Sequence, residues 1–247
     1  MKYNKPFEWS GHKWISRERW GNCHPAKPDW WYDPERIEID KDEILHLKTK
    51  YNPKELLLVN GDRVESKVGV GLISSVDKFK YGKYEIEAKL PEGKNLWPAF
   101  WMWAWETYPP EIDVLEAYSD YANRWGYFWN GRFHEWFMGK IWRVESNIHL
   151  IDNSIEGNWT LGAKRNYFGF KKPTKRFVKY ELIWLKDKIE IYYDGKLNRR
   201  ETDRKILKQF DNVTMNVIIN NGITGKADPN KIEESDFQIK YFKYTPY

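Results

Sequence analysis

Three carboxylates lie close together in an otherwise apolar stretch near the middle of the chain. Glu111, Asp113 and Glu116 belong to the segment EIDVLE, which follows the aromatic run LWPAFWMWAW. Burying a charged side chain without a partner is costly, so we expect these residues to have a chemical task. Two acidic side chains about 5–5.5 Å apart can cleave a glycosidic bond, one as nucleophile and one as general acid.

The spacing of the three carboxylates limits how a β-strand can present them. Successive side chains of a strand point to opposite faces, so Glu111 and Asp113 share a face while Glu116 falls on the other. One extra residue near Val114 or Leu115, a β-bulge, would bring Glu116 back to the face of the other two. We therefore predict a bulged strand that presents three carboxylates to one cleft.

The elements around this strand are predicted to be short β-strands separated by turns. Alternating or buried apolar segments recur along the chain at Glu35–Asp40, Glu43–Lys50, Val68–Ser75, Lys83–Leu90, Leu96–Trp105, Arg143–Ile151, the hairpin within 176–197, Val213–Gly222 and Phe237–Tyr244. We expect a structured loop region with one edge strand over residues 1–35, a loop over 152–175 and a short turn at 206–210. No stretch has a helical period of useful length, so an all-β sandwich of two sheets is predicted.

Within 96–105 both faces of the predicted strand are apolar, as in a central strand of a sandwich. One face would carry Trp97, Ala99, Trp101, Trp103 and Trp105, and the other Phe100, Met102 and Ala104. Most of these tryptophans are expected to pack in the core.

The motif and its flanks resemble a known family. EIDVLE matches the E-x-D-x-x-E signature of glycoside hydrolase family 16, which includes laminarinases, lichenases, agarases and carrageenases. The resemblance extends from about Trp20 to Tyr244, through WGN at 20–22, YGKYEIEAKLPEGKNLWPAFWM at 81–102, ELIWLKDKIEIYYDGKL at 181–197 and SDFQIKYFKY at 235–244. It implies a jelly-roll sandwich of two antiparallel sheets with a concave substrate cleft, formed by residues 1–247 as a single domain.

The resemblance also implies a role for each acidic residue. Glu111 would attack the anomeric carbon, and Glu116 would protonate the leaving oxygen and then activate water. Asp113 would hydrogen-bond the nucleophile and add negative charge that keeps Glu116 protonated. His149 stands where the family has a histidine beside the carboxylates, and VTMNVIINNG is placed on the cleft floor. Family members often have a tryptophan shortly before the motif, whereas this chain has Tyr108, Pro109 and Pro110 there.

Aromatic residues are the most unusual feature of the composition. The chain has 15 tryptophans and 16 tyrosines, more than a core of this size needs, and flat rings with a polar edge suit the C–H faces of sugars. The segment Tyr121–Lys140 is rich in aromatics without clean alternation, and we interpret it as a long binding loop. The predicted substrate-binding residues are Asn22, Trp97, Trp101, Trp125, Trp129, Arg132, Trp136 and His149.

Together these features predict an endo-β-glycosidase that acts on a polysaccharide. β-1,3- or mixed-linkage glucan is the commonest substrate in the family, but a β-galactan such as agar, porphyran or carrageenan stays open. A sulfated chain would suit the basic residues Arg124, Arg132, Arg143, Lys164 and Arg165. A transglycosylase would use the same residues, and a non-catalytic, lectin-like relative is the alternative from another class.

The remaining expectations concern partners and location. The net charge is +5 with acidic residues mixed throughout, which argues against a nucleic-acid face. The single cysteine, Cys23, excludes an internal disulfide, and no apolar stretch is long enough to span a bilayer. We expect a monomer without nucleic-acid or membrane partners. The family implies secretion or display on the cell surface, although the start of the chain has no signal peptide.

No metal and no cofactor are expected. The motif itself contains no histidine, so a metal site is a weaker interpretation of the three carboxylates. Many relatives bind a structural calcium through an aspartate in the closing strand, and the corresponding position here is Lys240. An ammonium group cannot ligate calcium, which needs oxygen donors.

Overall fold

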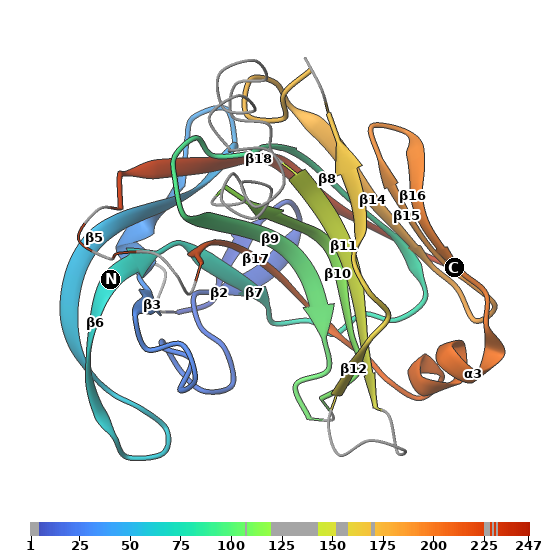
Figure 1. Ribbon diagram of the computed structural model, residues 1–247, viewed down its shortest axis with the longest axis horizontal. Coiled ribbons are helices and arrows are strands. Elements are labelled where there is room, and N and C mark those ends of the chain that lie inside the picture. The colour runs from blue at the N-terminus through green and yellow to red at the C-terminus, as the bar shows by residue number, and fades with distance from the viewer. Residues whose placement is uncertain are drawn as a thin grey trace, which may run out of the picture.

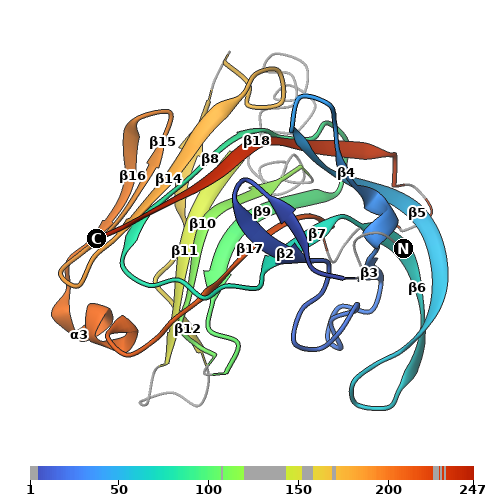
Figure 2. The same cartoon turned by 180° about the vertical axis from the view of Figure 1, so that it is seen from behind.

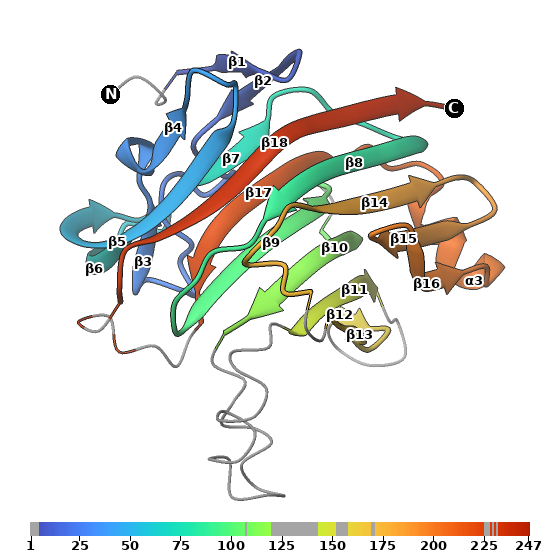
Figure 3. The same cartoon turned by 90° about the horizontal axis from the view of Figure 1, so that it is seen from above.

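The computed structural model describes residues 5–106, 108–119, 143–151, 158–168, 171–224, 228, 230 and 232–247. Their strands form two sheets that pack face to face, as Figures 1 and 3 show. A short helix, α3 (Arg204–Leu207), lies at the opposite end of the molecule from strands β5 and β6 (Figure 2). In the described part of the chain, no helix is long and apolar enough to cross a membrane.

The first sheet, called the cleft sheet below, contains the acidic motif. Its strand order is β1 (Phe7–Trp9), β2 (His12–Ile15), β7 (Leu72–Ser75), β17 (Asn216–Ile223), β9 (Leu96–Trp103), β10 (Glu111–Tyr118), β11 (Arg143–Ile151) and β12 (Asn158–Thr160), with β13 (Lys164–Tyr167) also paired to β11. All these pairs are antiparallel. The motif strand therefore lies between two neighbours, β9 and β11, that can both supply side chains to it.

The second sheet, called the outer sheet, covers the back of the first. Its order is β16 (Lys196–Glu201), β15 (Ile189–Tyr193), β14 (Val178–Trp184), β8 (Gly82–Lys89), β18 (Ser235–Pro246), β5 (Leu45–Leu57), β6 (Arg63–Val70) and β3 (Trp30–Tyr32), with β4 (Ile37–Ile39) paired to β5. Only the short β3–β6 pair is parallel. The predicted sandwich of two sheets is confirmed, with this one exception to antiparallel pairing.

The core lies between the sheets, and β9 shows how the sequence divides its two faces. Phe100 and Met102 are fully buried, while Trp97 and Trp101 on the other face are only partly buried. Burying each large apolar side chain contributes about 1.5–3 kcal/mol to folding. The alternation predicted for 96–105 is thus confirmed. The expectation that most of its tryptophans pack in the core is wrong, because among them only Trp103 is buried. One face of the strand packs in the core, and the other points away from it.

The segment Val68–Ser75, predicted as one strand, is two strands that belong to different sheets. It crosses from β6 to β7 at Gly71, whose N–H donates to Lys48 O at 2.7 Å and whose carbonyl accepts from Asn221 N at 3.0 Å. A Cβ at this position would lie 2.7 Å from the carbonyl oxygen of Arg36. The alternating pattern continued through the crossing, so the sequence alone did not reveal it.

Other differences concern short or polar strands. Residues 1–35 contain β1, β2 and β3 in place of one edge strand, and 152–175 includes β12 and β13 in place of a loop alone. Strand β5 continues through Pro53, which lies at a register shift between Tyr51 and Lys54. Proline is tolerated there because a bulge leaves its missing N–H without a ladder partner. The segment 206–210 belongs to short helices and not to a simple turn.

Candidate active site

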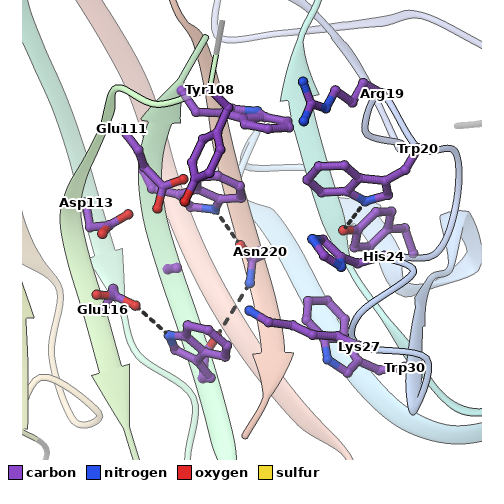
Figure 4. Close-up of a pocket in the computed structure, with 15 residues that line it drawn as sticks. Arg19, Trp20, His24, Lys27, Trp30, Tyr108, Glu111, Asp113, Glu116 and Asn220 are labelled. Atoms are coloured by element: carbon purple, nitrogen blue, oxygen red, sulfur yellow. Dashed lines mark hydrogen bonds between the residues drawn. The ribbon is translucent and has the colours of Figure 1, made fainter. Parts of the chain in front are cut away.

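A cleft of about 250 Å³ lies on the face of the cleft sheet that points away from the core. Its floor is formed by β9 and β17, through side chains that include Trp97, Trp101 and Asn220. Figure 4 shows the motif carboxylates along one side and a segment from 19–30 on the facing side. Residues far apart in the sequence therefore meet across one concave surface.

The predicted bulge is present and aims all three carboxylates into this cleft. Asp113 of β10 pairs with Trp101 of β9, and Leu115 pairs with Phe100, which directly precedes Trp101. Val114 is therefore the extra residue on β10. The register with β11 shifts over the same interval. Glu111, Asp113 and Glu116 all line the cleft. The carbonyl of Val114 accepts a hydrogen bond from the hydroxyl of Tyr193 in the outer sheet at 2.8 Å, which holds the bulge from behind.

Glu116 is held by donors from three positions. Its Oε1 accepts from Trp97 Nε1 at 3.1 Å and from the hydroxyl of Tyr118 at 2.7 Å, and its Oε2 accepts from Asn147 Nδ2. The residue is only 6% exposed. These contacts leave the carboxyl group little rotational freedom, so its position relative to a bound sugar is fixed by the protein.

The other two carboxylates share a histidine. His149 Nε2 lies 2.9 Å from Asp113 Oδ2 and 3.6 Å from Glu111 Oε1, and its Nδ1 lies 2.8 Å from the hydroxyl of Thr160. The histidine thus lies beside the carboxylates, where the family resemblance had placed it. Thr160 on β12 fixes the orientation of the ring.

Burial and mutual repulsion change the proton affinity of this acidic group. Burial, and then the negative charge of Asp113, raise the pKa of Glu111 well above its usual range. Burial, and then the charge of Glu116, do the same for the pKa of Asp113. Hydrogen bonding between the two carboxyls raises the pKa of Glu111 and lowers that of Asp113, so the two groups share a proton and titrate together.

Glu111, Asp113 and His149 could also be considered as a metal site, because one ligand atom from each lies within 4.8 Å of the others. The sequence analysis argued against a metal because the motif contains no histidine. The histidine of this group comes from a neighbouring strand, β11. The same three groups already contact one another directly, with His149 Nε2 2.9 Å from Asp113 Oδ2 and 3.6 Å from Glu111 Oε1.

The facing side of the cleft, called the facing wall below, is built from one continuous segment. It contributes Arg19, Trp20, His24, Lys27 and Trp30 to the lining. Of these five residues only Trp20 lies in the WGN segment, which resembles an early cleft segment of the family. The sequence reasoning missed the other four.

Hydrogen bonds tie the facing wall to the outer sheet. The side-chain amide of Asn22 donates to the carbonyls of Ser16 and Tyr32 at 3.1 and 3.2 Å, and Trp20 Nε1 donates to the Tyr32 hydroxyl at 2.9 Å. Asn22 was predicted to bind substrate, but it is not among the residues that line the cleft. It holds the wall that does so.

A buried carboxyl lies at the base of this wall. Glu18 is fully buried, and burial raises its pKa to about 8 against opposing hydrogen-bonding contributions from Ser74, Trp103 and Trp105. Neither carboxyl oxygen has a well-formed hydrogen bond. Glu18 therefore keeps its proton in the folded protein up to a pH of about 8.

The other predicted binding residues divide into two groups. Trp97 and Trp101 line the cleft, and Trp101 Nε1 donates to Asn220 Oδ1 at 2.8 Å. Trp125, Trp129, Arg132 and Trp136 lie outside the described residues, as does Arg124. Lys164 and Arg165 are exposed on β13 and do not belong to the described lining of the cleft.

The sequence matches one family over most of its length. Residues 26–243 match the family described as Glycosyl hydrolases family 16. The chain therefore belongs to this family, in agreement with its EIDVLE motif and with its two-sheet fold.

Two curated proteins show what kinds of relatives the chain has. It is 24% identical over 163 residues to Endo-1,3-1,4-beta-glycanase EglC from Rhizobium meliloti (strain 1021), covering 64% of this chain and 29% of that protein. It is 37% identical over 137 residues to a Beta-1,3-glucan-binding protein from Penaeus monodon, covering 48% of this chain and 31% of that protein. The chain thus spans less than a third of the length of each.

Solved structures agree on the fold along almost the whole chain. A Bacteroides ovatus mixed linkage glucan PUL (MLGUL) GH16 protein in complex with G4G4G3G product has a TM-score of 0.70 and 19% identity, with 98% of each chain covered. The catalytic domain of an endo-1,3-beta-glucanase (laminarinase) from Thermotoga petrophila RKU-1 has a TM-score of 0.69 and 18% identity, covering 100% of this chain and 96% of that one.

Proposed function

We propose that this chain is a retaining endo-β-glycosidase that cleaves a β-1,3- or mixed-linkage glucan by double displacement. The observation that carries the proposal is the Val114 bulge, which brings Glu111, Asp113 and Glu116 to one side of a single cleft. Binding alone would not need two glutamates held in different surroundings beside a histidine.

In the first step the carboxylate of Glu111 attacks the anomeric carbon, and the glycosidic C–O bond breaks. The leaving oxygen takes the proton of Glu116, whose carboxyl is oriented by Trp97, Tyr118 and Asn147. Asp113 lies beside Glu111 on the same side of the cleft, where it would hydrogen-bond the nucleophile and where its negative charge would favour the protonated form of Glu116.

In the second step a water molecule replaces the departed chain. Glu116 takes a proton from this water as it attacks the anomeric carbon, and the bond to Glu111 breaks. Both carboxyls return to their starting states, and the product keeps its anomeric configuration.

The substrate proposal is supported by the named activities of relatives and by the lining of the cleft. The curated relatives include an Endo-1,3-1,4-beta-glycanase and a Glucan endo-1,3-beta-glucosidase A1. Tryptophans on the floor offer flat faces for sugar rings. Because a polysaccharide is met outside the cell, secretion or surface display stays our prediction, as does a monomeric state.

The roles of the glutamates are tested by replacing each with its amide. Glu111→Gln and Glu116→Gln should each lower the release of reducing ends from laminarin and lichenan by at least about 1,000-fold, since each removes an essential step. Glu106→Gln serves as the control, because Glu106 is exposed and pairs with Lys78 outside the cleft. Full activity in either cleft variant, or inversion of the anomer in ¹H NMR, would refute the proposal.

A binding function without cleavage is the second candidate, because the relative at 37% identity is named a Beta-1,3-glucan-binding protein. Affinity electrophoresis in gels containing laminarin measures binding independently of hydrolysis. Retardation of the wild-type chain without any release of reducing ends would favour this candidate. Cleavage by the wild type, with binding retained in Glu111→Gln, would exclude it.

A further inference from the structure

The side chain of Lys27 projects from the facing wall into the cleft (Figure 4). Its Nζ lies over the Trp97 ring, 4.1 Å from the ring centroid. Trp97 in turn donates to Glu116. Lys27 therefore stands above the tryptophan nearest to the proposed general acid.

Among the residues that the structure describes, Lys27 forms no ion pair, and the nearby carboxylates Glu111 and Asp113 pair with His149. Burial lowers the pKa of Lys27, and the charges of the three cleft carboxyls oppose this lowering from across the cleft. A charged donor that is close to a binding surface and unpaired is available to a ligand.

The two cations of the described lining, Arg19 and Lys27, both come from the facing wall and lie across the cleft from the three carboxyls. His24 on the same wall is neutral near pH 7, because burial and then the charges of Lys27 and Arg19 lower its pKa to about 4. The positive charge of the described lining is therefore gathered on the side of the cleft to which Lys27 belongs.

The position of Lys27 also disfavours simple stacking at this place. A neutral sugar could lie flat on Trp97 only after displacing the ammonium group and its cation–π contact. A sugar that carries an oxyanion could keep Lys27 in place and bind to it directly. Arg19 is less free to do this, since its Nη1 donates to Trp105 O at 2.6 Å and its guanidinium lies over Trp103.

We propose that Lys27 forms a subsite over Trp97 for a sugar unit that carries an oxyanion substituent, a carboxylate or a sulfate. The inference rests on the proposed glycosidase function and specifies its substrate as an acidic or acid-substituted β-glycan. Lys27 contacts the substrate and determines specificity, and it takes no part in the bond-breaking steps.

The test compares substrates that share a backbone. The assay at low ionic strength uses laminarin, laminarin oxidised at C6 to carboxylate, and laminarin sulfate. Comparison of the two charged forms shows whether the site prefers a carboxylate or a sulfate. The wild type should have a higher kcat/KM on at least one charged form than on laminarin. This advantage should shrink as salt is added, because exposed charges are screened.

Substitution of Lys27 then locates the effect. Lys27→Gln should lower kcat/KM on the preferred charged form about tenfold more than on laminarin, whereas Lys27→Arg should keep the preference. Lys54→Gln is the matched control, because Lys54 Nζ lies 4.4 Å from the Trp31 centroid, outside the described lining of the cleft. Lys54→Gln should leave the ratio of kcat/KM on each charged form to kcat/KM on laminarin unchanged.

Two results would overturn the inference. One is a wild type without preference for either charged form. The other is an equal loss on all three substrates in Lys27→Gln, which would mean that Lys27 only balances the cleft carboxylates. If the wild type cleaves none of the three, the glycosidase proposal fails separately. Affinity electrophoresis of the same variants on the same glycans then still decides whether Lys27 selects an oxyanion.

Discussion

At the scale of single residues, the cleft gives two chemically identical side chains different surroundings. Glu116 is fixed by three donors, from Trp97, Tyr118 and Asn147, whereas Glu111 faces Asp113 and His149. Differences of this kind are how one site assigns acid and nucleophile roles to two carboxyls. Most of the discrimination comes from residues outside the motif itself.

Removing one of the donors should impair the chemistry more than the binding. Tyr118→Phe deletes the hydroxyl that donates to Glu116 Oε1 at 2.7 Å and leaves the ring in place. We expect kcat on laminarin to fall about tenfold with little change in KM, because an oriented hydrogen bond to a reacting carboxyl is lost.

The outer sheet supplies a matched control for this variant. The hydroxyl of Tyr192 donates to Glu190 Oε2 at 3.1 Å, in the same tyrosine–glutamate arrangement two residues apart. Tyr192→Phe should leave both kinetic constants unchanged. Equal kinetics for Tyr118→Phe and the wild type would show that the hydroxyl does not position Glu116.

At the scale of elements, two local irregularities place the site. The extra residue Val114 returns Glu116 to the cleft, and Tyr193 from the other sheet bonds the carbonyl of this bulge. Gly71 lets the chain pass from the outer sheet to the cleft sheet. The bulge redirects the side chain of Glu116, and the glycine lets the chain pass between the sheets. A regular strand would allow neither.

The crossing should tolerate no side chain. In Gly71→Ala the new Cβ would lie 2.7 Å from Arg36 O and 2.9 Å from Leu47 Cα, both backbone atoms that cannot move aside cheaply. We expect a loss of about 3 kcal/mol in the free energy of unfolding and a fall in Tm of about 6–12 °C. Thermal unfolding followed by circular dichroism measures this.

Gly162→Ala is the comparison for the crossing. Gly162 has a φ of +77°, and no atom lies within 4 Å of its hypothetical Cβ. Gly162→Ala therefore measures only the free-energy cost of placing an alanine in the left-handed backbone conformation. That cost should be about 1 kcal/mol. A Gly71→Ala variant no less stable than Gly162→Ala would show that the crossing can relax.

At the scale of the whole molecule, several buried carboxyls make stability depend on pH. Glu18, Glu111 and Asp113 all have raised pKa values, with burial as the main cause. Between its ordinary pKa near 4.5 and its folded pKa of about 8, Glu18 holds a proton in the native state that the unfolded chain releases. The native state binds more protons there, so stability falls as pH rises through this window.

Glu18→Gln should remove part of that dependence. We expect the variant to match the wild type within about 1 kcal/mol at pH 5 and to exceed it at pH 8, by a difference on the order of a few kcal/mol. Urea unfolding at both pH values measures the change, with the exposed Glu8→Gln as control. An unchanged slope between pH 5 and 8 would contradict the raised pKa of Glu18.

The sequence predicted the parts of the site that lie on strands with a regular pattern. The bulge followed from the spacing of Glu111, Asp113 and Glu116, and the exposed face of Trp97 and Trp101 followed from alternation. The facing wall was missed, because an irregular segment has no period from which the direction of its side chains can be predicted. Its contacts with the cleft depend on bonds such as Trp20 to Tyr32, which no local pattern encodes.

The facing wall has a consequence for how this scaffold can change. One uninterrupted stretch, 19–30, supplies nearly all of one side of the described cleft lining, while β10 supplies the proposed catalytic carboxyls on the other. Its anchor, Asn22, can be kept while neighbouring positions are exchanged. A library of variants at Arg19, His24 and Lys27 would therefore change substrate specificity while Glu111, Asp113 and Glu116 stay unchanged.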